Sequence, residues 1–181
     1  MIKSEKLKKF TELLLEWNKI HNLTGAKTPL EVEKNIEDSL FPSTFIDTPS
    51  SILDVGTGAG FPGLLLAMAY PNIRTVLCEP RKKRASFLKY VAMELELSNV
   101  EVAKKRVEDY DSEPFGLISS RAVTDTKMLL KLTEHLQNSE TQYLFYKGEH
   151  LFSELETVQV ALDYDIIEKN QRNYLYIKKV L

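Results

Sequence analysis

Apolar residues recur at helical spacing near the start of the chain, and this pattern predicts a helix from Ser4 to Ile20. A second helix is predicted to begin at Thr28-Pro29-Leu30-Glu31, which combines an N-cap threonine, a proline in the first position and a glutamate three residues after the cap. We expect this helix to end at about Leu40, before a proline. Residues 1–45 have no strand pattern, so they are predicted to form a small helical extension.

From residue 46 to 181, short apolar runs alternate with segments of helical periodicity, which predicts a second domain. The predicted strands are 51–55, 75–78, 100–103, 115–119 and 142–146. The predicted helices are 60–70, 81–97, 125–137 and 151–162. This alternation is typical of an α/β fold with a mostly parallel sheet and helices on both faces. Two further runs, Tyr164–Ile167 and Tyr174–Val180, are too close together for a crossover helix, so we expect an antiparallel hairpin.

Composition favours a soluble protein with one substantial core. The chain has 181 residues, of which 43% are hydrophobic, and no stretch approaches the ~18 apolar residues that a membrane span needs. The start of the chain lacks the apolar region of a signal peptide. A single cysteine and three scattered histidines match no metal-binding spacing. We therefore expect a cytoplasmic protein, monomeric, without a metal and without a membrane partner.

Positive charge is concentrated in the middle of the chain. Residues 74–106 hold nine Lys and Arg against four Asp and Glu, although the whole chain has a formal charge of −2. Four of these cations, Arg81, Lys82, Lys83 and Arg84, stand together where a helix is predicted to begin. The amino end of a helix dipole is positive, so this placement opposes the dipole. The cluster is either a phosphate-binding surface for RNA or a solvated helix face.

A glycine-rich loop follows the first predicted strand, in the segment Asp54-Val55-Gly56-Thr57-Gly58-Ala59-Gly60-Phe61-Pro62-Gly63. Glycines between a strand and a helix permit a tight turn and a close approach of the backbone to a nucleotide-like ligand. Glu79 ends the next strand, where a carboxylate can accept hydrogen bonds from two ribose hydroxyls. Val107 and Glu108 follow the third strand and are expected at the adenine edge.

Two enzyme classes fit this loop. Gly58-x-Gly60-x-x-Gly63 also matches the dinucleotide fingerprint, so an oxidoreductase that uses a nicotinamide or flavin nucleotide is the alternative. Asp54 before the first glycine is typical of methyltransferases, where it helps to hold the loop and the methionine end of the cofactor. The chain also lacks room for a separate catalytic domain, and its predicted terminal hairpin resembles the end of the methyltransferase sheet. The sequence therefore favours a methyltransferase that uses S-adenosylmethionine.

Motifs along nearly the whole chain resemble one family, the bacterial small-subunit (16S) ribosomal RNA guanine-N7 methyltransferases, also called glucose-inhibited division protein B. The matching segments are Trp17-Asn18-x-x-x-Asn22-Leu23-Thr24, Asp38-Ser39-Leu40, Asp54 to Gly63, Lys83-Arg84-x-x-Phe87-Leu88, Arg106-x-Glu108, Ser120-Arg121-Ala122 and Lys147-Gly148. The resemblance implies a class I methyltransferase fold, Rossmann-like, with a seven-stranded, mostly parallel sheet and a terminal antiparallel hairpin. Two positions depart from the family, which usually has His at Asn35 and Ala at Val107.

The resemblance also implies a site and a reaction. Cofactor contacts are implied at Gly56, Phe61, Val107-Glu108 and Arg121. The methyl group of S-adenosylmethionine would pass to guanine N7 in 16S ribosomal RNA, presented as RNA or as a small ribosomal subunit. N7 carries a lone pair and no proton, so we expect Arg121 and Lys147 to serve positioning and not proton transfer. Asn18 and Asn22 are candidates for RNA contact, with helix-end packing as the alternative.

Other functions remain open at this stage. The same fold can methylate another RNA or a small molecule, and a non-enzymatic assembly factor can use it only to bind RNA.

Overall fold

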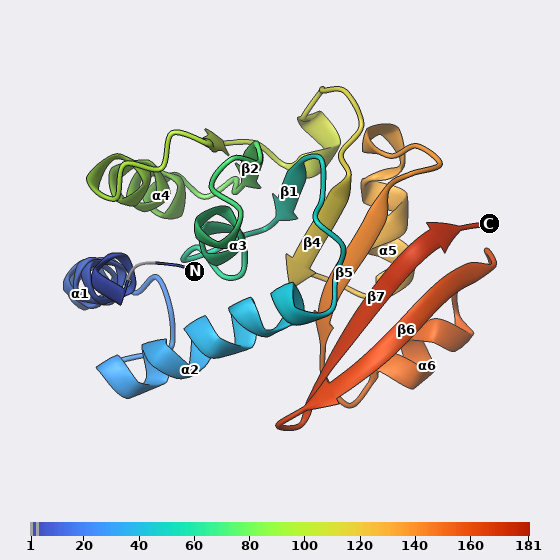
Figure 1. Ribbon diagram of the computed structural model, residues 1–181, viewed down its shortest axis with the longest axis horizontal. Coiled ribbons are helices and arrows are strands. Elements are labelled where there is room, and N and C mark those ends of the chain that lie inside the picture. The colour runs from blue at the N-terminus through green and yellow to red at the C-terminus, as the bar shows by residue number, and fades with distance from the viewer. Residues whose placement is uncertain (1, 3) are drawn as a thin grey trace.

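A computed structural model describes residue 2 and residues 4–181, and it contains a seven-stranded sheet flanked by helices (Figure 1). The strands are β1 (Ile52–Val55), β2 (Thr75–Cys78), β3 (Val100–Ala103), β4 (Leu117–Arg121), β5 (Gln142–Lys147), β6 (Leu162–Lys169) and β7 (Arg172–Val180). Their order across the sheet is β3-β2-β1-β4-β5-β7-β6. The first five strands in this order are parallel, whereas β7 is antiparallel to both β5 and β6.

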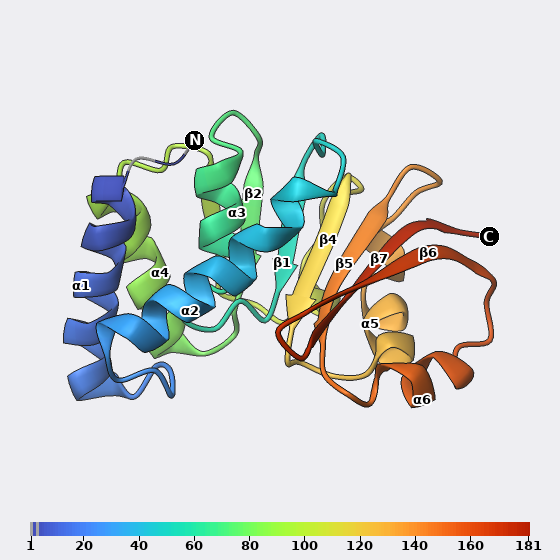
Figure 2. The same cartoon turned by 60° about the horizontal axis from the view of Figure 1, so that its bottom comes forward.

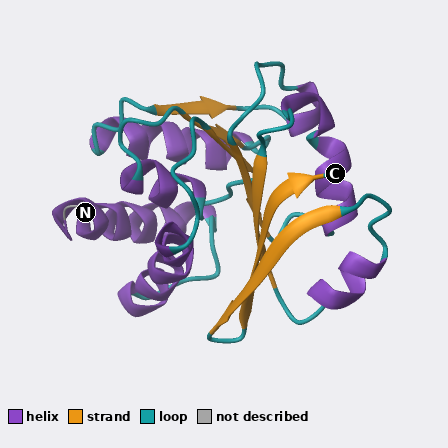
Figure 3. Ribbon diagram, turned by 45° about the vertical axis from the view of Figure 1, so that its right-hand side comes forward, coloured by secondary structure: helices purple, strands orange, loops and turns teal. Residues whose placement is uncertain are grey.

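Helices cover both faces of the sheet, as the side view in Figure 3 shows. The α-helices are α1 (Ser4–His21), α2 (Pro29–Leu40), α3 (Gly63–Ala69), α4 (Lys82–Glu94), α5 (Thr126–Leu132) and α6 (Leu151–Glu156). Helices α1 to α4 share one apolar core, and α5 and α6 pack over the other face. Every residue of β1 and β2 is buried, as expected for parallel strands covered on both sides.

The amino-terminal helices pack against the rest of the fold. Side chains of α1 and α2 contribute to the same core as α3 and α4, and the Phe10 and Phe61 rings meet edge-on with centroids 5.4 Å apart. Figure 2 shows α2 crossing beside α3 towards the middle of the sheet. The predicted start of α2 is confirmed: the Thr28 hydroxyl accepts a hydrogen bond from the Glu31 amide, and the Glu31 carboxylate accepts one from the Thr28 amide.

The carboxyl-terminal hairpin is confirmed, and its turn has a clear physical basis. Asn170 and Gln171 join β6 to β7 with φ angles of 51° and 62°. Two successive residues in the left-handed region form the kind of turn whose twist matches that of paired strands. The hairpin brings the beginning of β7 next to the end of β5, because Asn173 pairs with Lys147.

Several predicted boundaries were wrong. The helix predicted over residues 151–162 ends at Glu156, because Leu162 is already paired with Val180 in the sheet. The helix predicted over 125–137 is α5 followed by a 3₁₀ turn from Glu134 to Leu136. The fourth strand begins at residue 117 and not at 115, and the helix predicted from residue 60 begins at residue 63, after the glycine loop. Strand pairing decided the start of β4, where the local pattern did not.

Within the described part of the chain, no helix is both long enough and apolar enough to cross a membrane.

Candidate active site

The glycine loop lies at the carboxyl end of β1, between β1 and α3. Its glycines Gly56, Gly58 and Gly60 have φ angles of 66°, 61° and 100°, a region that side chains rarely enter. The neighbours of β1 in the sheet are β2 and β4, so the loop stands where the strand order reverses, the usual ligand position in such sheets. A methyl group built on Gly58 would meet no heavy atom nearer than 3.9 Å. The Gly58 position therefore has only ordinary van der Waals neighbours, and its backbone can receive a ligand closely.

Asp54 links the glycine loop to the sheet through hydrogen bonds. Its side chain is fully buried; Oδ2 accepts a hydrogen bond from the Gly63 amide at 2.9 Å, and Oδ1 accepts one from the Ser119 hydroxyl at 2.7 Å. Burial raises the pKa of Asp54 to about 6, although these hydrogen bonds oppose the rise. The nearby hydroxyl of Thr57 is buried without a hydrogen bond of good geometry, yet it lies close enough to lower the pKa of Asp54. These contacts agree with the predicted loop-holding role of Asp54.

Glu79 lies beside the loop at the end of β2. Its side chain is almost completely buried, and its two oxygens accept hydrogen bonds from the Gly58 amide at 3.0 Å and the Arg81 amide at 2.9 Å. A carboxylate has about four lone-pair positions, so capacity for ligand hydroxyls remains. Val107 is buried and Glu108 exposed in the turn after β3, at the same edge of the sheet. The residues predicted to hold an adenosyl group thus follow the carboxyl ends of adjacent strands.

Arg121 ends β4 and faces the amino-terminal helices. Its guanidinium carbon lies 5.0 Å from the centre of the Phe61 ring, and Nη1 donates to Asp38 and to Asn35 Oδ1, both at 3.0 Å. The side chain of Arg121 is 16% exposed. Asn35, which departs from the family pattern, therefore helps to orient a predicted cofactor residue.

Asp38 gathers further partners that the sequence pattern did not reveal. Its Oδ1 atom accepts hydrogen bonds from Arg172 Nε at 3.1 Å and from the Tyr174 hydroxyl at 2.8 Å. Both partners belong to β7, more than 130 residues away along the chain. No local motif signals such a contact; only the pairing of the hairpin with β5 brings these residues to α2.

Lys147, at the end of β5, is held by acceptors on two sides. Its ammonium group donates to the Thr124 carbonyl oxygen at 3.0 Å and to Glu154 Oε2 at 2.7 Å, and the side chain is 7% exposed. A cavity of about 160 Å³ opens beside it. The residues that line this cavity are Ser120, Ala122, Thr124, Leu129, Tyr146, Lys147, Gly148, Glu154 and Arg172.

The cavity adjoins the glycine loop. Ser120 lines the cavity and donates from its hydroxyl to the carbonyl oxygen of Val55, the residue before Gly56, at 3.1 Å. The next loop also touches the glycine loop, because a methyl group built on Gly56 would lie 2.5 Å from a methyl of Val123. A nucleotide-like ligand on the glycine loop and a second ligand in the cavity would therefore be neighbours.

The two asparagines proposed for RNA contact differ in their surroundings. Both ends of the Asn18 amide are used within the protein: Oδ1 accepts from the Thr24 amide and Nδ2 donates to the Ala26 carbonyl, each at 2.9 Å. Asn22 is exposed just after α1, with φ of 49°. These contacts favour the helix-end interpretation, and RNA contact by either residue stays a prediction.

The basic cluster divides into two parts. Arg81, Lys82 and Lys83 are exposed at the start of α4, and no side chain caps that helix. Arg84 instead turns towards the loop, where its Nη1 atom lies 4.0 Å from Glu79 Oε2. The first three side chains are therefore free for a ligand outside the loop, whereas Arg84 belongs to the loop's surroundings.

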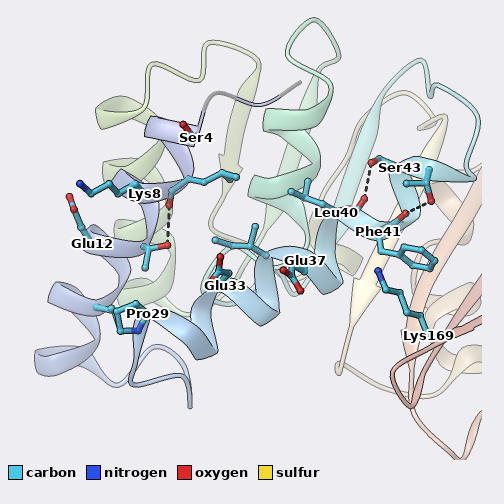
Figure 4. A pocket seen from close by; sticks show the side chains of 15 residues that line it. Ser4, Lys8, Glu12, Pro29, Glu33, Glu37, Leu40, Phe41, Ser43 and Lys169 are labelled. Carbon is cyan, nitrogen blue, oxygen red and sulfur yellow. Dashed lines mark hydrogen bonds between the residues drawn. The ribbon is translucent and has the colours of Figure 1, made fainter.

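A much larger hollow than the cavity beside Lys147 lies elsewhere on the surface. It is a groove of about 1080 Å³ between α1 and α2 that reaches Phe41 and Lys169 (Figure 4). None of its lining residues belongs to the glycine loop. Among residues 2 and 4–181, no three His, Cys, Asp or Glu side chains are grouped so that they could hold a metal ion.

The fold is that of methyltransferases that use S-adenosylmethionine. An O-methyltransferase from Bacillus cereus, solved in complex with SAH, aligns with a TM-score of 0.64 at 16% identity, over 99% of this chain and 93% of that one. A putative S-adenosyl-L-methionine-dependent methyltransferase from Methanococcus maripaludis also gives 0.64, at 14% identity, over 99% and 96%.

Within this class, the chain belongs to the rRNA small subunit methyltransferase G family, whose model matches residues 3–179. Curated relatives named ribosomal RNA small subunit methyltransferase G include those of Wolinella succinogenes, 49% identical over 172 residues (95% of this chain, 88% of the relative), and Helicobacter pylori, 41% identical over 174 residues (96% of each). The predicted family, fold class and enzyme class are confirmed, as is S-adenosylmethionine as the cofactor. The oxidoreductase alternative is not favoured.

Proposed function

We propose that this chain transfers the methyl group of S-adenosylmethionine to N7 of a guanine in 16S ribosomal RNA. The supporting observation is that the glycine loop and the cavity beside Lys147 adjoin each other at one edge of the sheet. The names of the relatives support ribosomal RNA of the small subunit as the substrate. Guanine N7 rests on the family resemblance in the sequence.

The residues around the loop fit the cofactor. The backbone of Gly56, Gly58 and Gly60 would receive the methionine end beside Phe61, with Asp54 holding the loop from below. Glu79 would accept the ribose hydroxyls, and Val107 with Glu108 would border the adenine. When bound, S-adenosylmethionine supplies an electrophilic methyl group. Arg121, fixed by Asn35 and Asp38 over the Phe61 ring, would keep that side of the loop in place.

Positioning carries most of the proposed catalysis. N7 has a lone pair and bears no proton, so the protein needs no general base and must align N7 with the methyl group. Guanine gains positive charge as the bond forms, which an unpaired cation nearby would oppose. Lys147 is paired with Glu154, and Arg121 with Asp38, so neither cation faces the reacting base uncompensated. The target base must be exposed, or taken out of its stack, to reach this edge.

The exposed cations at the start of α4 are proposed to hold the RNA backbone. Arg81, Lys82 and Lys83 follow β2 and therefore lie at the same edge of the sheet as the loop. Arg84, Asn18 and Asn22 are further candidates, of which Arg84 and Asn18 also have contacts within the protein. We propose that the enzyme acts as a cytoplasmic monomer without a metal, which light scattering and metal analysis of the purified protein would test.

Two measurements test the function. Calorimetric titration should detect binding of S-adenosylmethionine or its demethylated product, and none of a nicotinamide nucleotide; the reverse result would refute the cofactor assignment. Mass spectrometry of small-subunit RNA should find one N7-methylguanine that disappears when the gene is deleted and returns with it. RNA binding without methyl transfer would instead indicate a non-enzymatic assembly factor, and a methylated product other than this RNA would indicate another substrate.

A further inference from the structure

Glu154 on α6 is held by three donors that all reach the same oxygen. Oε2 accepts hydrogen bonds from Lys147 Nζ at 2.7 Å, the Thr126 amide at 2.9 Å and the Thr126 hydroxyl at 2.9 Å. Oε1 has no such partner in the described part of the chain, and the side chain is 23% exposed. Glu154 therefore has one carboxylate oxygen without a partner in the described part of the chain, and the residue lines the cavity.

The cavity connects Glu154 with the surroundings of the glycine loop. Ser120, bonded to the strand that leads into the loop, forms one part of the lining, and Glu154 enters from α6 on the outer side of β5. The volume of about 160 Å³ is well below the ~300–1,000 Å³ of pockets for drug-sized ligands, so the cavity suits one flat base and not a whole nucleotide.

Guanine has the chemistry that this arrangement requires. Its N7 and O6 acceptors share one edge, whereas its N1–H and N2–H₂ donors lie on the neighbouring edge beyond O6. A base with N7 directed to the loop would direct N2–H₂ away from the loop and N1–H to the side. We propose that Glu154 selects guanine by accepting hydrogen bonds from this donor edge through Oε1. Adenine has an acceptor at N1 and no amino group at C2, so it would leave the carboxylate unpaired.

The same contact would favour the reaction as well as binding. Methylation at N7 places positive charge on the guanine ring and makes its N1–H a stronger donor, so the bond to a carboxylate strengthens as the methyl arrives. An interaction that is stronger in the transition state raises kcat. The three donors on Oε2 fix the carboxylate beforehand, so little reorganisation accompanies the reaction.

The inference rests on the proposed function and is tested with inosine, which lacks the N2 amino group but keeps N7, O6 and N1–H. Small-subunit RNA carrying guanosine or inosine at the mapped position is prepared by ligation, and single-turnover methyl transfer is measured with saturating S-adenosylmethionine. The wild-type enzyme should methylate guanosine about ten- to a hundredfold faster than inosine, because inosine cannot make the hydrogen bond from N2 to Oε1, and a hydrogen bond to a charged group contributes about 1.5 to 3 kcal/mol.

Glu154→Gln should remove most of that preference. The three donors on Oε2 require an acceptor, so the glutamine oxygen would face them and its NH₂ group would face the donor edge of guanine. The ratio of guanosine to inosine rates should fall to about threefold or less, and Glu154→Ala should lower it similarly. The matched control is Glu156→Gln, which makes the same substitution at an exposed position of the same helix and should keep the wild-type ratio.

The rate ratio separates recognition from a structural role, because a merely distorted site slows both substrates alike. If Glu154→Gln slows guanosine and inosine by the same factor, Glu154 does not read the base and the inference is wrong. If the wild-type protein methylates no guanine N7 in this RNA, the proposed function itself fails, and this inference fails with it.

Discussion

The buried carboxylate of Asp54 makes a quantitative prediction about stability. Burial raises its pKa from 3.8 to about 6 in the folded protein, whereas an unfolded chain returns the group to its ordinary value. A raised pKa means that the folded protein holds the proton more tightly. The contribution of Asp54 to stability is therefore greatest below about pH 4 and is lost as the pH rises through about 6.

The size of the effect follows from the shift. About two pKa units correspond to about 3 kcal/mol, because one unit is about 1.4 kcal/mol. Roughly 2 kcal/mol of this loss develops between about pH 4.5 and pH 7.5, where unfolding can be measured. Asp54→Asn removes the titrating group. The altered hydrogen bonds to Gly63 and Ser119 then change the free energy of unfolding by an amount that does not depend on pH. The free energy of unfolding of the variant minus that of the wild type should therefore rise by about 2 kcal/mol as the pH increases from about 4.5 to 7.5.

Urea unfolding of both proteins at a series of pH values provides the assay, with the difference in unfolding free energy plotted against pH. Asp111→Asn, which removes an exposed carboxylate, is the matched control and should give a flat difference. A flat difference for Asp54→Asn as well would refute the reasoning, because it would mean that Asp54 binds its proton equally in the folded and unfolded states.

Three further predictions concern the loop, the basic cluster and the second helix. Gly58→Val should lose calorimetric binding of S-adenosylmethionine, because a side chain at a φ of 61° strains the loop and occupies the space that the ligand needs, whereas circular dichroism should still show a folded protein. Gly25→Val, where a side chain meets no heavy atom within 4 Å, should keep cofactor binding. The double variant Lys82→Ala, Lys83→Ala should weaken RNA binding and lower the slope of log affinity against log salt by roughly 0.7 to 0.9 per lost phosphate contact. Its affinity for the cofactor should be unchanged. A slope equal to that of the wild type would mean that the two lysines only form a solvated helix face. Thr28→Ala should cost about 1 kcal/mol of unfolding free energy in urea, since it removes the capping box; a loss near zero would contradict that role.

The glycine loop and the second helix were predictable because their causes are local. Positive φ angles require glycine at Gly56, Gly58 and Gly60, so the loop is visible in the sequence. The cap at Thr28 depends on residues only three positions apart. The strands 75–78 and 100–103 were also predicted at their observed bounds, because a short apolar run between turns is typical of a strand.

The contacts around Asp38 and Glu154 were not predictable in this way. Asp38 meets Arg172 and Tyr174 only because the terminal hairpin pairs with β5, and no sequence spacing encodes that contact. Glu154 resembled an ordinary charged residue on a predicted helix, and that helix was extended six residues too far. Its significance depends on Lys147 and Thr126, which come from two other elements.

The sequence by itself determined the alternation of strands and helices, the cofactor loop and the family. These features depend on side-chain periodicity and backbone conformation, which short stretches of chain specify. Only the tertiary structure decided which charges are neutralised, which carboxylate oxygen stays unused, and how the cavity lies beside the loop. Such properties depend on groups that are distant in sequence and become neighbours when the sheet forms, so their energies exist only in the folded chain.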